Sequence, residues 1–289
     1  MIPDHISRNI TKSNYRVILV RATQVAQLIG SEQHQLSGLP LAHFADGILS
    51  ALLLATQLKG AGVLSVEFDS DGPFDNYRCD ATPLGLVRAM IPNSTFEKIK
   101  NWDGKGPLIG KGNLYIGKKI EGSHAPFNSI LELVAPDFSK NISNYLQKSE
   151  QINGVVALCS IVVGNQVISC DGFMIEEMPN TNQEGRDKMH HQISKIQKPQ
   201  DIFVGEPDDA MVLKQILGDI TPVNIKDFNI AFYCPCSQDR FIDNLVGLPK
   251  NELDHLCDDK NMVNTQCDFC KKDYAISLKE IINKKETKK

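Results

Sequence analysis

Two short stretches near the end of the chain, FYCPCSQDRF (residues 232–241) and QCDFCKKDYA (residues 266–275), hold four cysteines in two close pairs. One residue separates the first pair and two residues separate the second: Cys234, Cys236, Cys267 and Cys270. A tetrahedral Zn²⁺ site needs four thiolates at about 2.3 Å from the metal, and two tight turns of this kind supply them. We therefore predict that the four cysteines bind one Zn²⁺ per chain, with iron in a similar four-sulfur site as the alternative metal.

The rest of this terminal segment has little material for a core of its own. Its large apolar side chains are few and include Phe241, Leu245, Leu248, Leu253, Leu256, Phe269 and Tyr274. A chain this short supplies no more than about 3–5 kcal/mol from its own core, whereas structural zinc contributes about 10–16 kcal/mol. We expect residues 232–289 to form a C-terminal zinc-binding domain whose fold depends on the metal. Because thiolates become disulfides when an oxidant reaches them, oxidation could release that fold.

Upstream, residues 1–179 mix helical and strand patterns. Apolar residues recur at three- and four-residue steps in 39–59 and 137–152, which predicts two helices. Alternating apolar segments predict strands, and Gly164-Asn165 predicts a two-residue hairpin turn. The strand segments are 14–22, 63–68, 84–91, 110–120 and two within 155–178. Without a regular strand–helix alternation, the pattern predicts an α+β core domain with antiparallel strands.

The composition changes after residue 179. Residues 180–231 are polar and broken by glycines and prolines, with scattered aliphatic residues that predict two short helices, in DKMHHQISKIQ and DAMVLKQILG. A segment of this kind stays ordered only by packing on another part of the protein. We therefore predict a metastable helical linker over residues 180–231.

Composition also narrows the class of protein. Of the 289 residues, 42% are apolar and the net charge is −4, so nothing drives the chain as a whole toward nucleic acid or an anionic membrane. The beginning of the chain does not resemble a secretory signal. The most apolar run, residues 47–58, is shorter than the roughly 18 residues that a bilayer requires. We expect a soluble cytoplasmic protein.

The other cysteines have a different character. Cys79, Cys159 and Cys170 lie in strand-like apolar surroundings and are expected to be inert buried thiols. Cys257 lies inside the predicted zinc domain, where it could compete as a ligand, but its place next to Leu256 on a predicted helix favours a bystander role. The histidines and carboxylates form no catalytic constellation, so we do not expect an enzyme.

The cysteine module and the core together resemble the redox-regulated 33-kDa heat-shock chaperones. The resemblance spans nearly the whole chain and is sharpest in the terminal module and in the Ser149-Glu150-Gln151 helix end. The module residues that match are Cys234, Cys236, Ser237, Arg240, Glu252, Leu253, Cys267, Phe269, Cys270 and Tyr274. The core matches at DGP (71–73), LVRAMI, GKGNLYIG and GFMIEEMP, and departs at Ser70-Asp71 and Ala89, where the family tends to have glycine.

The resemblance implies a function as an ATP-independent holdase. It implies that oxidation pairs Cys234 with Cys236 and Cys267 with Cys270, expels zinc, unfolds the terminal domain and linker, and exposes surface that binds unfolding client proteins. Homodimer formation through the core, expected in the oxidised state, is likewise implied by the family. Candidate client-binding residues in the linker are Val212, Leu213, Ile216 and Leu217.

Two other classes of function fit the cysteine spacing. A zinc ribbon that binds nucleic acid has the same ligands, but acidic residues balance the basic ones around them and no basic face is visible. An enzyme with a thioredoxin-like redox CxxC would open a helix directly after a core strand, whereas CDFC runs into strand-like sequence.

Overall fold

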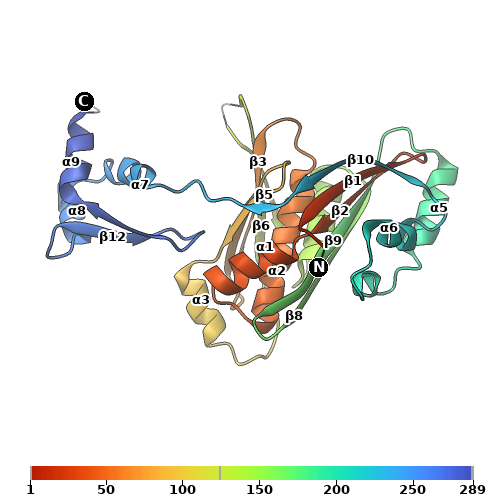
Figure 1. Cartoon of the computed structure of the whole chain (residues 1–289), viewed down its shortest axis with the longest axis horizontal. Coiled ribbons are helices and arrows are strands. Elements are labelled where there is room, and N and C mark those ends of the chain that lie inside the picture. Colours follow the sequence, from red (N-terminus) through yellow and green to blue (C-terminus); the bar gives the residue numbers. More distant parts are fainter. Residues whose placement is uncertain (1, 124, 288–289) are drawn as a thin grey trace. The chain divides into compact units, whose positions relative to one another are not determined.

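The computed structural model describes residues 2–123 and 125–287 (Figure 1). The chain divides into two compact units, Met1–Phe232 and Tyr233–Lys289. The first unit contains two large sheets with helices, and the second contains a two-stranded hairpin with short helices. This is the mixed α+β architecture, with antiparallel sheets, that the sequence predicts.

Five antiparallel strands form the first sheet, in the order β10-β1-β2-β9-β8. Its strands are β1 (His5–Thr11), β2 (Tyr15–Arg21), β8 (Gly154–Val163), β9 (Gln166–Glu177) and β10 (Pro222–Asn229). The β8–β9 hairpin turns at Gly164-Asn165, where Gly164 has φ 62° and Val163 pairs with Gln166. The predicted hairpin is therefore confirmed.

Six strands form the second sheet, in the order β11-β5-β4-β3-β6-β7. They are β3 (Gly62–Ser70), β4 (Asn76–Ala81), β5 (Leu86–Met90), β6 (Gly112–Ile120), β7 (Phe127–Glu132) and the short β11 (Ala231–Phe232). All neighbours pair antiparallel except β11, which runs parallel to β5. Because β11 ends two residues before Cys234, the second sheet holds the chain directly ahead of the cysteine module.

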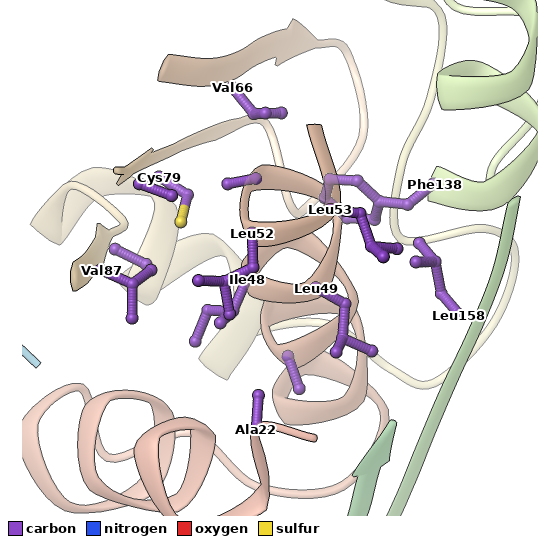
Figure 2. Packing of buried hydrophobic residues seen from close by; sticks show 14 of the residues in the cluster. Ala22, Ile48, Leu49, Leu52, Leu53, Val66, Cys79, Val87, Phe138 and Leu158 are labelled. Carbon is purple, nitrogen blue, oxygen red and sulfur yellow. The ribbon is translucent and has the colours of Figure 1, made fainter. Parts of the chain in front are cut away.

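Helix α2 (Gly38–Ala55) lies between the two sheets and forms the centre of the core. Figure 2 shows Ile48 and Leu52 facing Cys79 and Val87 of the second sheet, while Leu49 and Leu53 face Phe138 and Leu158. The two sides of one helix thus contact both sheets, which explains why its apolar residues do not follow a single narrow stripe.

A glycine in the middle of α2 permits one close contact with the second sheet. A Cβ on Gly47 would come within 2.4 Å of the Tyr77 ring, whose hydroxyl donates a hydrogen bond to the Phe44 carbonyl at 3.2 Å. Of the helices in the described ranges, α2 is long and apolar enough to cross a membrane by length and composition, but 67% of its apolar window is buried inside the protein.

The remaining helices of the core surround this centre. They are α1 (Thr23–Ala26), the π-helix η1 (Gln27–Gln33), α3 (Asn93–Lys100) and α4 (Phe138–Lys148). Asp137 caps the start of α4, where its side chain accepts a hydrogen bond from the Lys140 amide, and the apolar face of the helix joins the core through Ile142, Tyr145 and Leu146. The helices predicted in 39–59 and 137–152 are therefore present.

Residues 180–221 cover the face of the first sheet that points away from α2. They form α5 (Gln183–Ile193), the 3₁₀ helix η2 (Pro199–Phe203) and α6 (Asp209–Leu217). Both predicted helices are present, but the first begins four residues before the predicted segment 187–197 and ends at Ile193. Their buried side chains join those of three strands in one apolar cluster, which we call the linker–sheet cluster. Its members are Tyr15, Val17, Leu19, Ala157, Cys159, Phe173, Ile175, Met189, Ile202, Phe203, Val212, Leu213, Ile216 and Leu217.

A set of charged side chains around the buried Arg21 binds the start of α6 beside this cluster. The Arg21 guanidinium, whose side chain is 4% exposed, lies 3.2 Å from Asp209 and donates to the Pro207 carbonyl at 2.7 Å. The His5 imidazole Nε2 lies 2.8 Å from the other oxygen of Asp209, and Arg21 also reaches Asp171 at 3.5 Å. This group, which we call the α6 clasp, joins residues far apart in the chain, so only folding brings it together.

The end of residues 180–231 differs from the helical linker that the sequence analysis describes. Residues 222–229 form β10, the edge strand that pairs with β1. The pairing passes from Arg8–Lys226 to Asn9–Asn224, which leaves Ile225 as an extra residue. That bulge interrupts the alternation of apolar residues, so the period-two pattern that predicts a strand is absent from this segment.

The second unit is small and is built around one hairpin. Its elements are α7 (Gln238–Leu245), α8 (Lys250–Leu256), β12 (Met262–Gln266), β13 (Asp273–Ser277) and α9 (Leu278–Thr287). Its buried core consists of Ile242, Leu253, Val263, Cys267, Tyr274, Ile276 and Ile281. Residues 288–289, the end of the predicted zinc domain, lie outside the described residues.

Candidate metal centre

Two loops of the second unit carry the four cysteines. The first, Cys234-Pro235-Cys236, leads into α7, whose start is capped by Ser237 accepting from the Arg240 amide at 3.3 Å. The Arg240 guanidinium turns back and donates to the Pro235 carbonyl at 3.0 Å, which holds this loop against its own helix. A local sequence of loop, cap and helix therefore orients both sulfurs.

The second loop joins β12 to β13. The Cys267 amide donates to the Lys272 carbonyl and the Lys271 amide donates to the Cys267 carbonyl, each at 2.9 Å. Lys271 has φ 57°, which lets the chain reverse directly after Cys270. Because the CxxC is followed by a strand and not by a helix, this loop lacks the arrangement of a thioredoxin-like redox site.

The four sulfurs meet across the two loops. All four lie within 4.8 Å of one another, with Cys234 Sγ 3.7 Å from Cys267 Sγ and Cys236 Sγ 3.3 Å from Cys270 Sγ. Tetrahedral ligands at about 2.3 Å from a zinc ion stand about 3.8 Å apart. Cys267 is buried and the other three are half-buried. The group has the ligand number, the donor chemistry and nearly the spacing of a four-sulfur metal site, so it could bind a metal ion.

The thiols differ in their surroundings. Burial raises the pKa of Cys234, and it raises the pKa of Cys270 to about 12. Burial also acts on Cys236, but hydrogen bonds from the Tyr274 hydroxyl and the neighbouring thiols outweigh it and lower the pKa of Cys236 to about 7. Without a cation Cys234 and Cys270 hold their protons at neutral pH, and a bound divalent cation would favour their thiolates, so metal affinity should fall at low pH.

The other cysteines lie apart from this group. Cys79, Cys159 and Cys170 are buried in the first unit, and burial raises the pKa of each. This environment is typical of unreactive thiols. Cys257 directly follows α8, forms an isolated antiparallel β-bridge with Val263 through its backbone, and is not a member of the four-sulfur group.

The four candidate client-binding residues lie in the linker–sheet cluster. Val212, Leu213, Ile216 and Leu217 form the buried face of α6, while Met211 on the same helix is 56% exposed. In this structure the four are therefore packing residues. The strand residues in the same cluster were not predicted from the sequence, although the unbroken apolar run Val17–Val20 in β2 is typical of a strand with both faces covered.

Comparisons with known proteins cover nearly the whole chain. A family model described as Hsp33 protein matches residues 4–277. Similar curated proteins include the 33 kDa chaperonin of Thermodesulfovibrio yellowstonii, 27% identical over 96% of this chain and 97% of that protein. The 33 kDa chaperonin of Bacillus subtilis is 26% identical over 90% of this chain and 91% of that protein.

One similar solved structure is the crystal structure of a 33 kDa chaperonin (heat shock protein 33 homolog) from Thermotoga maritima. It has a TM-score of 0.85 and 21% sequence identity, and the match covers 99% of both chains. At this identity the likeness shows that the fold is shared.

Proposed function

Because the chain belongs to the Hsp33 protein family, we propose that it is a redox-regulated molecular chaperone that holds unfolding proteins without ATP. The observation that carries the proposal is the meeting of four sulfurs in a unit with a small core. The relatives named 33 kDa chaperonin support the chaperone part. The oxidant response is supported by the chemistry of the thiols themselves.

In this proposal the metal is Zn²⁺ and its ligands are Cys234, Cys236, Cys267 and Cys270. A set of four thiolates suits zinc better than the oxygen-seeking cations. When bound, zinc would link the two cysteine loops through these four sulfurs. The apolar core beside them supplies no more than about 3–5 kcal/mol, against about 10–16 kcal/mol from a structural zinc site. The residues of the second unit should therefore stay folded only while the thiolates are available as ligands.

Oxidation removes those ligands. In forming one disulfide, two thiolates give two electrons to one molecule of hydrogen peroxide, which takes up two protons and leaves as two molecules of water. We propose the pairs Cys234–Cys236 and Cys267–Cys270. A disulfide inside each loop leaves no covalent link between the loops, whereas the short distances in the folded unit, Cys234 to Cys267 and Cys236 to Cys270, run between them. Disulfides within the loops would therefore leave the two cysteine loops free to separate.

Loss of the second unit is proposed to release residues 180–221 from the first sheet. Release would expose both halves of the linker–sheet cluster, including Val212, Leu213, Ile216 and Leu217 on α6 and the aromatic and aliphatic residues of β2 and β9. An exposed apolar surface made of these side chains could bind the apolar segments that an unfolding protein exposes. We propose that clients bind there.

The remaining properties of the proposed chaperone come from the family. We propose that it acts in the cytoplasm, forms a homodimer when oxidised, and binds neither nucleic acid nor membranes. It acts by binding and not by catalysis, which agrees with a family of chaperones.

The test compares reduced and oxidised protein. Zinc-loaded protein is treated with hydrogen peroxide at mild heat, and zinc release, thiol loss and suppression of client aggregation are followed together. We expect all three to rise in parallel. Cys267→Ser should lose zinc and hold clients without oxidant, whereas the control Cys257→Ser should keep one zinc and behave as the natural protein. Retention of all zinc by oxidised protein that does not suppress aggregation would disprove the proposal, and zinc loss in Cys257→Ser would change the ligand assignment.

A further inference from the structure

A tyrosine outside the four-sulfur group contacts one of its members. The Tyr274 hydroxyl donates a hydrogen bond to Cys236 Sγ at 3.1 Å. Tyr274 lies on β13, four residues after Cys270, and is 9% exposed. The hydrogen bond therefore joins the strand that follows the second cysteine loop to a sulfur of the first loop.

Two neighbouring side chains contact the phenol ring of Tyr274. Its centroid lies 4.8 Å from that of Phe241 on α7, and Lys272 Nζ lies 5.4 Å from the ring centroid. Tyr274 also belongs to the buried core of the second unit. Because packing fixes the ring, the hydroxyl is directed at the sulfur without a further loss of side-chain freedom.

A hydrogen bond to a metal-bound thiolate has two consequences. It holds the ligand in place, and the loss of such an outer contact typically weakens metal binding by about 10–100-fold. It also engages a lone pair of the sulfur, which lowers the reactivity of that sulfur toward an oxidant. In that attack the thiolate forms an S–O bond and breaks the O–O bond of a peroxide, giving a sulfenic acid and hydroxide. A second thiolate then forms the disulfide and displaces another hydroxide.

We propose that Tyr274 is a positioning residue that holds Cys236 as a ligand and restrains its reaction with peroxide, so that its hydroxyl sets how much oxidant the site tolerates. This inference rests on the proposed function for its biological meaning. The contact itself can be tested in reduced protein, where no redox response is required.

The experiment removes the hydroxyl and keeps the ring. Tyr274→Phe is compared with Tyr233→Phe, which removes a hydroxyl from a side chain that is 54% exposed and directly precedes Cys234. Zinc affinity is measured in reduced protein by competition with a chelator, and the rate of zinc release is measured with hydrogen peroxide. Circular dichroism of the zinc-loaded forms checks that both variants fold.

We expect Tyr274→Phe to bind zinc about 10-fold or more weakly and to release it correspondingly faster, with Tyr233→Phe unchanged. In cobalt-substituted protein the sulfur-to-cobalt absorption band should shift in Tyr274→Phe alone, a change that a packing role would not cause. Equal affinity and an unshifted band in both variants would overturn the inference. If the natural protein releases no zinc with peroxide, the proposed function fails while the affinity and the band still decide the role of Tyr274.

Discussion

Replacing Ile216 by alanine tests whether apolar packing holds α6 on the first sheet. Ile216 is fully buried in the linker–sheet cluster, where strand residues including Val17 and Phe173 are also buried. Truncation of a buried isoleucine to alanine removes about 2–5 kcal/mol through lost burial and the cavity left behind. If α6 is held on the sheet by a margin of only a few kcal/mol, this change removes much of it.

The loss has a measurable consequence in the reduced, zinc-loaded protein. A change of about 2 kcal/mol raises the population of the released state about 30-fold. Hydrogen exchange of the α6 amides should accelerate by at least that factor, while the α2 amides exchange as before. Protease cleavage within residues 204–221 should rise in parallel, and clients should be held without any oxidant.

The matched control is Met211→Ala on the same helix. Met211 is 56% exposed, so its truncation should leave exchange of α6 and client binding close to those of the natural protein. The reasoning fails if Ile216→Ala exchanges like the control, or if its α6 is released and no client binds. The second result would separate release of the linker from chaperone activity.

Three further predictions concern the metal and the α6 clasp. Chelation of zinc in reduced protein should unfold residues 233–287 and release residues 180–221, while the rest of the first unit keeps its structure, because about 10–16 kcal/mol of metal binding is lost against a core worth about 3–5 kcal/mol; hydrogen exchange that stays slow in the second unit would contradict this. The hydrogen bond to Asp209 raises the pKa of His5 above 6.5, so its contribution to docking of α6 is complete below that pH and is lost as pH rises through the raised value. Exchange of α6, corrected for its intrinsic pH dependence, should accelerate over that range, and His5→Asn should abolish the effect. Arg21→Met leaves Asp171 and Asp209 without their buried cation and should cost about 3–5 kcal/mol in urea unfolding of the first unit; a loss below about 1 kcal/mol would show that the clasp is not needed.

Much of the candidate site could be predicted because its parts are close in sequence. Cys234 and Cys236 share one loop, Cys267 and Cys270 share another, and the spacing within each loop restricts where two sulfurs can point. The helix predicted at 39–59 also follows from local periodicity, and the turn at Gly164 from its tolerance of positive φ. Strand β10 was not predicted, because its bulge breaks the alternation of apolar and polar residues by which a strand is recognised.

The amino-acid sequence by itself determined the two cysteine pairs, the main helices and the hairpin, because each of these is set by residues within a few positions of one another. The tertiary structure alone decided that α6 covers the outer face of the first sheet, that Arg21 and His5 meet Asp209, and that Tyr274 reaches Cys236. These contacts join segments separated by tens to hundreds of residues, and many pairings of apolar faces and charges satisfy the same composition. The native set of pairings is the one in which all the apolar faces of the folded chain are buried at the same time.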